Sequence, residues 1–195
     1  MRSLLALLLM LFPLFAVADY DEDVDGDLSD DQFAPTLIEL EPGTNLIAAT
    51  NFESPLERDF FTIAIADNQF VSSIQLTEYV LLTQPSDGGS LIAIEEGPVV
   101  SDLLGGVPFR GLAIVGVGTG VAVGDELLDD LGGAPITPGV YSFWVQNTGS
   151  DTDYTLAIEL EQLGSPGGAI PVPTLGWPAL LLLMLGLLIV AIRRF

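Results

Sequence analysis

A strict alternation of apolar and polar side chains is the feature of this sequence that most restricts how the chain folds. It is clearest near residue 160, where Tyr154, Leu156, Ile158 and Leu160 alternate with Thr155, Ala157, Glu159 and Glu161. Successive side chains of a β-strand point to opposite faces, so the pattern predicts a strand with one face in a core and the other in solvent.

Similar short runs recur along the chain and are separated by turn residues such as Pro138-Gly139. The further predicted strands cover 36–40, 59–65, 73–81, 90–94, 111–115 and 140–146. This number of short strands predicts an all-β fold, an antiparallel β-sandwich. Residues 125–131 are expected to form one helical turn within a long connection, and Gly132 and Gly133 end it.

The charge of the central region restricts its partners. All 27 acidic residues lie between residues 19 and 169, whereas only Arg58 and Arg110 of the five basic residues do, which gives this part a formal charge of −25. DNA and RNA are bound through clustered Lys and Arg, so nucleic-acid binding is excluded. A field of this sign attracts cations instead.

The residue types also restrict catalysis. The sequence has no His, Cys or Lys, so the usual bases for a serine nucleophile and a His/Cys zinc site are missing. Only a carboxylate-based hydrolase remains as an enzymatic alternative. Adjacent acids such as Glu95 and Glu96 face opposite sides of a strand, which argues against a paired-carboxylate site. We therefore predict that the protein is not an enzyme.

The N-terminus has the features of an export signal. Arg2 precedes an apolar run over residues 4–15, and Ala16-Val17-Ala18 fits the small residues that signal peptidase requires. Cleavage is predicted between Ala18 and Asp19. The apolar run is about 12 residues long, and a membrane anchor needs roughly 20.

The acidic leader after this site has the spacing of a calcium loop. Asp21, Asp23, Asp25 and Asp27 alternate, and Gly26 permits a turn. The position where an EF-hand has its bidentate Glu is Gln32, and flanking helices are not predicted. An EF-hand is therefore rejected. Two alternatives stay open, a non-helical Ca²⁺ site and a disordered acidic leader.

Three segments resemble a known bacterial family. They are the acidic leader 23–31, the segment 57–63 with its Asp-Phe-Phe strand, and the final strands Gly139-Val140-Tyr141-Ser142-Phe143 and Asp153-Tyr154-Thr155-Leu156. In this order they resemble the pre-peptidase C-terminal (PPC) domain. The resemblance implies a PPC-like or jelly-roll β-sandwich of a secreted protein, which binds matrix or carbohydrate or assists secretion.

The same resemblance implies metal ligands. In related collagen-binding modules, acidic residues of the leader and of the turn before the Asp-Phe strand bind calcium. Transferred to this chain by position, the implied ligands are Asp21, Asp23, Asp25 and Asp27, joined by Glu57 or Asp59.

The C-terminus resembles the IPTL/PEP-CTERM class of sorting signals, which a membrane-embedded exosortase recognises. A Pro-containing motif is followed by an apolar run and two arginines, although a single residue, Gly176, separates Leu and Trp where the family usually has two. A Gly-Gly signal for a rhomboid-type protease at Gly167-Gly168 and a plain single-pass anchor are the alternatives. The predicted sorting residues are Val172, Pro173, Thr174, Leu175, Trp177, Arg193 and Arg194.

The apolar run 175–192 is just long enough to span the inner membrane, and the two arginines would keep the stub cytoplasmic. The predicted organisation is a signal peptide (1–18), an acidic leader (19–35), a β-sandwich (36–163), a Gly/Pro linker with the sorting motif (164–174), a transmembrane helix (175–192) and a basic stub (193–195).

These features predict a non-catalytic, exported bacterial protein of the cell surface or matrix, first anchored facing the periplasm. Its partners would be signal peptidase, the sorting enzyme and matrix polysaccharide, and Ca²⁺ is the one cofactor considered. The alternative is a carbohydrate-binding or adhesive module. The strand pattern places Trp144 opposite the predicted core residues of its strand. Two interpretations follow: Trp144 covers the end of the core or packs against a neighbouring strand, which is the favoured one, or it is the exposed platform for a sugar ring that the alternative would use.

Overall fold

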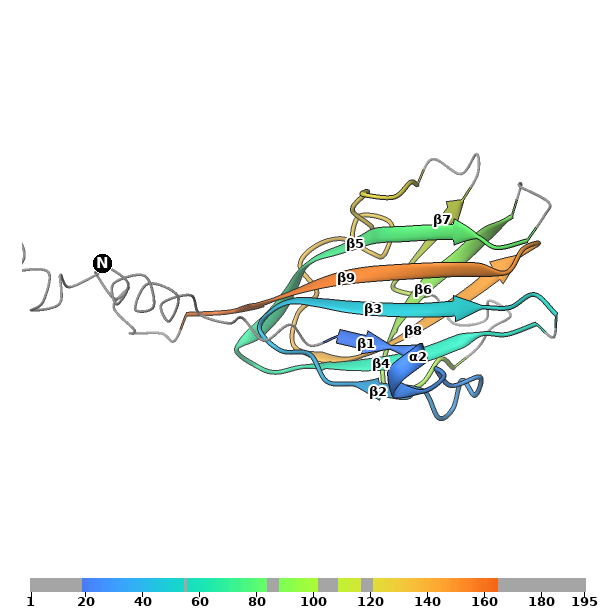
Figure 1. Ribbon diagram of the computed structural model, residues 1–195. Coiled ribbons are helices and arrows are strands. Elements are labelled where there is room, and N and C mark those ends of the chain that lie inside the picture. Colours follow the sequence, from blue (N-terminus) through green and yellow to red (C-terminus); the bar gives the residue numbers. More distant parts are fainter. Residues whose placement is uncertain (1–18, 55, 84–87, 102–108, 117–120, 165–195) are drawn as a thin grey trace, which may run out of the picture. The chain divides into compact units, whose positions relative to one another are not determined.

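The computed structural model describes residues 19–54, 56–83, 88–101, 109–116 and 121–164 (Figure 1). The chain divides into two compact units, Met1–Leu163 and Gly164–Phe195. The predicted signal peptide, the sorting motif, the apolar run 175–192 and the terminal arginines lie outside the described residues. Among the residues that are described, no helix has the length and apolar character needed to cross a membrane.

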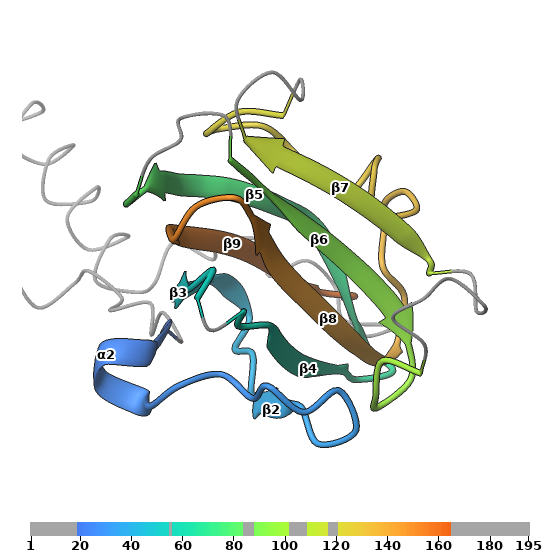
Figure 2. The same cartoon turned by 90° about the vertical axis from the view of Figure 1, so that its right-hand side faces the viewer.

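The described part of the first unit consists of nine strands in two sheets and one short helix. The elements are β1 (Asp19–Asp21), α2 (Glu22–Asp25), β2 (Thr36–Ile38), β3 (Gly43–Asn51), β4 (Asp59–Ile65), β5 (Gln69–Leu81), β6 (Gly89–Glu96), β7 (Gly111–Gly116), β8 (Gly139–Thr148) and β9 (Thr152–Gln162). Sheet A has the order β1-β3-β9-β5 and sheet B the order β2-β4-β8-β6-β7. The two sheets face each other as a sandwich (Figures 1 and 2).

The predicted all-β fold is confirmed, but the sandwich is not wholly antiparallel. β1 pairs with β3 and β2 pairs with β4 in parallel, while the other pairs are antiparallel. Both parallel strands are three-residue edge strands supplied by the segment that precedes β3. In each sheet the added strand runs parallel to its neighbour. Strands that follow one another through tight turns pair antiparallel, so the predicted antiparallel sandwich does not include these two pairs.

The inward side chains of both sheets form one core. Tyr141, Phe143 and Val145 of β8 belong to it, as the alternation predicts, and so do the four apolar positions of β9 from Tyr154 to Leu160. Phe143 stands opposite Phe61 of β4, and their rings stack at a centroid distance of 4.6 Å.

β3 is, with the short β1, a strand that the sequence pattern does not reveal. Its inward positions are Asn45, Ile47, Ala49 and Asn51, so a buried polar residue stands at each end of the apolar pair. The Asn45 amide donates to the carbonyls of Glu41, Gly43 and Ile158, which satisfies it inside the sheet.

The predicted helical turn is present in the connection between β7 and β8. The amide of Leu131 donates to the carbonyl of Leu127 at 2.9 Å, and Leu127, Leu128 and Leu131 are all buried. Gly111 makes room for this turn, because a Cβ at that position would collide with the backbone of Leu131.

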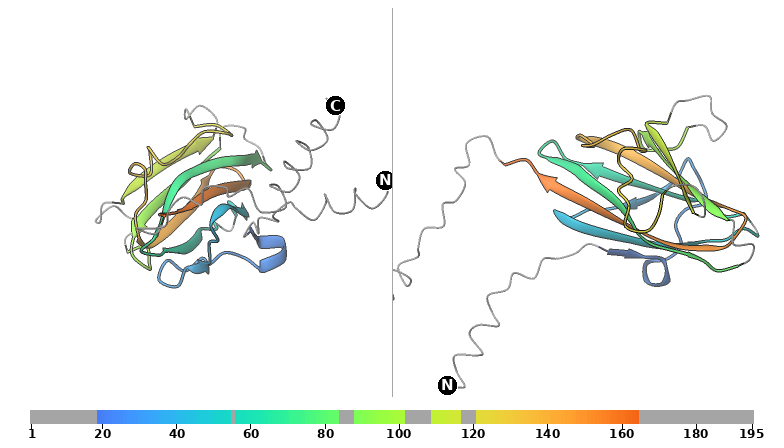
Figure 3. Two further views of the ribbon diagram at one scale, coloured as in Figure 1. Left: turned by 90° about the vertical axis from the view of Figure 1, so that its left-hand side faces the viewer. Right: turned by 90° about the horizontal axis from the view of Figure 1, so that it is seen from above.

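The acidic leader is part of the sandwich, so the hypothesis of a disordered leader is wrong. β1 pairs with β3, α2 lies beside that pair (Figures 2 and 3), and the Leu28 side chain is 2% exposed within the core. Ser29 forms an isolated bridge with Phe60 of β4. The buried Leu28 and the backbone pairing of β1 thus hold the leader in the fold, although its high charge alone would favour an unfolded segment.

Candidate functional site

Four acidic side chains meet where the leader joins the two sheets. Glu22 comes from α2, Asp27 from the turn after it, Glu57 from the β3–β4 loop and Asp59 from the first position of β4. We call them the leader cluster. They influence one another electrostatically: Glu22 and Glu57 raise the pKa of Asp59, and Asp27 raises that of Glu57 and Glu22.

Asp59 lies deepest in the leader cluster and is wholly buried. Its Oδ2 accepts hydrogen bonds from the Asn51 amide at 2.8 Å and the Tyr154 hydroxyl at 2.7 Å, while its Oδ1 has no hydrogen-bond partner. Burial raises the pKa of Asp59 well above its ordinary value, the charges of Glu22 and Glu57 raise it further, and the two hydrogen bonds oppose the shift. A buried oxygen without a partner in this setting favours a proton or a cation.

Glu22 joins the leader to sheet A through backbone groups. Its Oε1 accepts from the amide of Leu28 at 2.9 Å, and its Oε2 from the amide of Thr50 in β3 at 2.7 Å. Partial burial raises its pKa to about 7, against the lowering effect of these two hydrogen bonds.

Glu57 fixes the β3–β4 loop. Its Oε2 accepts from the amide of Phe52 at 2.9 Å, and the amide of Glu57 donates to the carbonyl of Phe52. Burial raises the pKa of Glu57, and the neighbouring Asp27 and Asp30 carboxylates raise it further.

No basic side chain of the described residues forms an ion pair with the leader cluster. The Nε of Arg58 donates to Oε1 of Gln146 at 2.8 Å, and Nη2 of Arg110 donates to the carbonyl of Gly133 at 2.8 Å. The cluster therefore has negative charge that the described part of the protein does not balance.

Of the six implied metal ligands, Glu57 is the one that links others, because Asp27 raises its pKa and Glu57 in turn raises the pKa of Asp59. Asp21 and Asp25 accept hydrogen bonds within the leader. Asp21 caps α2 by accepting from the amide of Asp23, and Oδ2 of Asp25 accepts from the amide of Asp21. These two hydrogen bonds use the carboxylates of Asp21 and Asp25 and the amides of Asp21 and Asp23, and they connect the two ends of the short helix. Within the described ranges, no group of three or more acidic side chains is close enough together to hold a metal ion by itself.

Glu22 is the member that sequence reasoning missed. It lies between the alternating aspartates, so the spacing of a calcium loop passes over it. Its importance comes from the hydrogen bonds to Leu28 and Thr50, which depend on how the leader folds back onto β3.

Trp144 is not an exposed stacking platform, and this counts against the carbohydrate-binding alternative. Its side chain is 8% exposed in a second apolar cluster with Phe60, Ala93 and Val100 on the outer face of sheet B. The rings of Phe60 and Phe109 lie 6.4 and 5.8 Å from it, centroid to centroid. The amide of Val100 donates to the carbonyl of Gln32, which ties the leader to this cover.

We expect the protein to become more stable when the pH is lowered from 7.5 to 5.5. The pKa of Glu22 rises from an ordinary 4.5 to about 7 on folding, so between these values the folded state binds more protons than the unfolded state. Stability therefore increases as the pH falls through this window. Solvent still reaches Glu22, so we discount its contribution to about 1 kcal/mol, or a midpoint shift of about 2–4 °C.

Thermal melts at the two pH values measure this shift. The Glu22→Gln variant should show a smaller difference, because it has no carboxyl to titrate. An equal shift in both proteins would assign the effect to other acids.

No protein-family model matches the sequence, and no curated protein is significantly similar to it.

Proposed function

We propose that this chain is a non-catalytic, exported bacterial protein of the cell surface or matrix, whose PPC-like sandwich is stabilised by calcium. Asp59 is the observation that carries the calcium part, because it is wholly buried and one of its oxygens has no partner. Glu22 and Glu57 add negative charge around it.

A divalent cation would relieve this charge. Glu57 and the free oxygen of Asp59 would hold it together with backbone carbonyl and water oxygens, since calcium accepts all three kinds of oxygen and does not need three carboxylates.

Export and sorting are supported by the two ends of the sequence and by its composition. The signal-like start, the Gly/Pro-rich stretch before Leu175 and the terminal Arg193-Arg194 fit a protein that crosses the inner membrane and is processed afterwards. Mass spectrometry of the protein from its native host tests this directly. We expect a mature N-terminus at Asp19 and a C-terminus upstream of Leu175; a mature chain that begins at Met1 would contradict export.

Calcium should raise the thermal midpoint of the full chain. Extracellular calcium sites bind with Kd of about 10⁻⁴–10⁻³ M, so about 10 mM Ca²⁺ would add roughly 1.4–2.7 kcal/mol, or about 3–10 °C. A chelator should reverse the shift.

Two variants make the calcium experiment specific. Glu57→Gln should remove most of the shift, whereas Asp129→Asn, an exposed carboxylate in the β7–β8 connection, should keep it. A midpoint that is unchanged by calcium, or equal shifts in both variants, would contradict a site at the leader cluster.

A further inference from the structure

The outer face of sheet A has an acidic trough that crosses its strands. Two adjoining hollows of about 240 and 350 Å³ share Asp21, Ala48, Glu78 and Thr155. Figure 1 looks onto this face, and no described segment crosses it between β1 and β5. The outer face of sheet B differs, because the cluster around Trp144 covers part of it.

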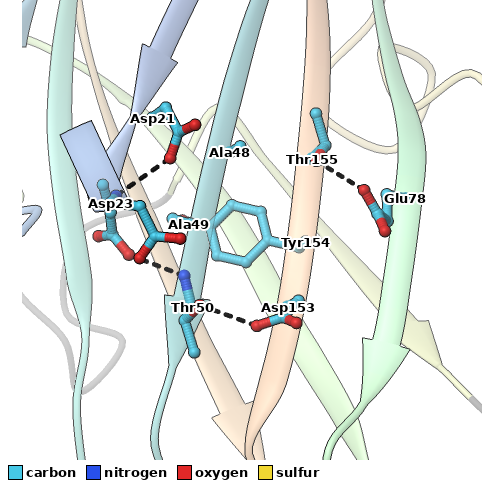
Figure 4. A pocket seen from close by; sticks show the side chains of 10 residues that line it. Asp21, Asp23, Ala48, Ala49, Thr50, Glu78, Asp153, Tyr154 and Thr155 are labelled. Carbon is cyan, nitrogen blue, oxygen red and sulfur yellow. Dashed lines mark hydrogen bonds between the residues drawn. The ribbon is translucent and has the colours of Figure 1, made fainter. Parts of the chain in front are cut away.

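Carboxylates stand on both walls of the trough. Asp21, Glu22 and Asp23 belong to the lining at β1 and α2. Figure 4 shows Asp21 and Asp23 on this side, with Asp153 of β9 and Glu78 of β5 opposite them. The floor between the walls consists of small side chains, those of Ala48, Thr50 and Thr155.

Threonines of the floor orient the opposite wall. The Thr50 hydroxyl donates to Oδ1 of Asp153 at 2.8 Å, and the Thr155 hydroxyl donates to Oε2 of Glu78 at 3.4 Å. The second oxygen of each carboxylate accepts no hydrogen bond from a described residue. These oxygens are available to a cationic partner.

The separation of the walls selects among cations. Neighbouring strands lie about 4.8 Å apart, so β1 and β9, with β3 between them, are separated by roughly 10 Å. Calcium binds its ligands at about 2.4 Å, so one metal ion cannot bridge the walls. A chain with several ammonium groups can reach both.

The lining also argues against a sugar polymer. Its two aromatic residues offer little ring surface for stacking, because Tyr154 is 2% exposed and Tyr20 is partly buried and packed against the core. Aliphatic lysine stems suit the floor of Leu46 and Ala48, with their ammonium groups at the carboxylates.

We propose that this trough docks an extended, lysine-rich segment of a partner protein. The acidic walls on either side, the small floor and the charge of the domain carry the inference through charge complementarity. The proposed peptide site does not depend on calcium at the leader cluster. The two sites share one carboxylate, that of Glu22, and otherwise consist of different residues.

A labelled ten-residue peptide of alternating Lys and Ser tests the proposal by fluorescence anisotropy with the full chain. The double variant Glu78→Gln/Asp153→Asn should bind about tenfold more weakly. The control variant Glu96→Gln/Asp129→Asn changes the net charge equally at exposed positions away from the trough and should bind within about twofold of the unchanged protein.

A variant that changes shape but not charge distinguishes binding in the trough from attraction to the overall negative charge of the domain. Ala48→Phe fills the floor without changing any charge, so it too should weaken peptide binding, with circular dichroism and a thermal melt to verify its fold. Equal losses of peptide affinity in the trough and control double variants would overturn the proposal.

Spermine tests whether the ligand is a small polyamine instead of a protein segment. If spermine binds as tightly as the peptide and loses affinity in the same variants, the proposal of a protein partner is overturned as well.

Discussion

Replacing Asp59 by Ala should lower the free energy of unfolding by about 3 kcal/mol, whereas Asp59→Asn should leave it within about 1 kcal/mol of the unchanged protein at pH 7.5 without calcium. Alanine removes the acceptor of two buried donors, the Asn51 amide and the Tyr154 hydroxyl. Each buried donor without a partner costs about 1–3 kcal/mol. Asparagine keeps an oxygen that accepts from both, and it removes the charge that burial penalises.

Urea unfolding of the three proteins at one pH measures these differences. Asp129→Ala is the matched control, and as an exposed substitution it should stay within about 0.5 kcal/mol. An equal loss for Asp59→Asn and Asp59→Ala would mean that the carboxylate charge itself stabilises this end of the sandwich. That result would contradict a raised pKa for Asp59.

The strands that sequence reasoning could predict best are those with three or more successive apolar or aromatic inward positions, as in β4, β8 and β9. β4 was expected at 59–65, where the structure has it, and the inward and outward sides of β8 and β9 follow the pattern. β3 escaped prediction because Asn45 and Asn51 occupy inward positions, and both amides are satisfied by hydrogen bonds that form only in the folded sheet.

The candidate site could be predicted only in part for a similar reason. Spacing and resemblance pointed to the acidic leader and to the start of β4, and Glu57 and Asp59 do influence each other there. Spacing could not distinguish these two from Asp21, Asp23, Asp25 and Asp27, because all six are acids in polar segments. The difference arises from tertiary contacts, which bury Asp59 completely and Glu57 in part and leave the four leader aspartates exposed.

Leu28 is the residue that turns the leader from a charged tail into part of the fold, and Leu28→Ala should cost about 2–4 kcal/mol. The side chain is 2% exposed in the core, and its backbone amide donates to Glu22. Truncation leaves a cavity and loosens the segment that also carries β1. We expect a non-specific protease to cleave the variant between residues 19 and 31 much faster than the unchanged protein.

The same variant separates anchoring of the leader from simple loss of core volume. If the leader detaches, Glu22 returns to solvent, its pKa approaches the ordinary 4.5, and the stabilisation between pH 7.5 and 5.5 shrinks. Val24→Ala, at a leader side chain that is 78% exposed, should change neither cleavage nor pH dependence. A Leu28→Ala protein that is less stable, yet keeps the original cleavage rate and pH dependence, would show that β1 pairing and Glu22 hold the leader without this anchor.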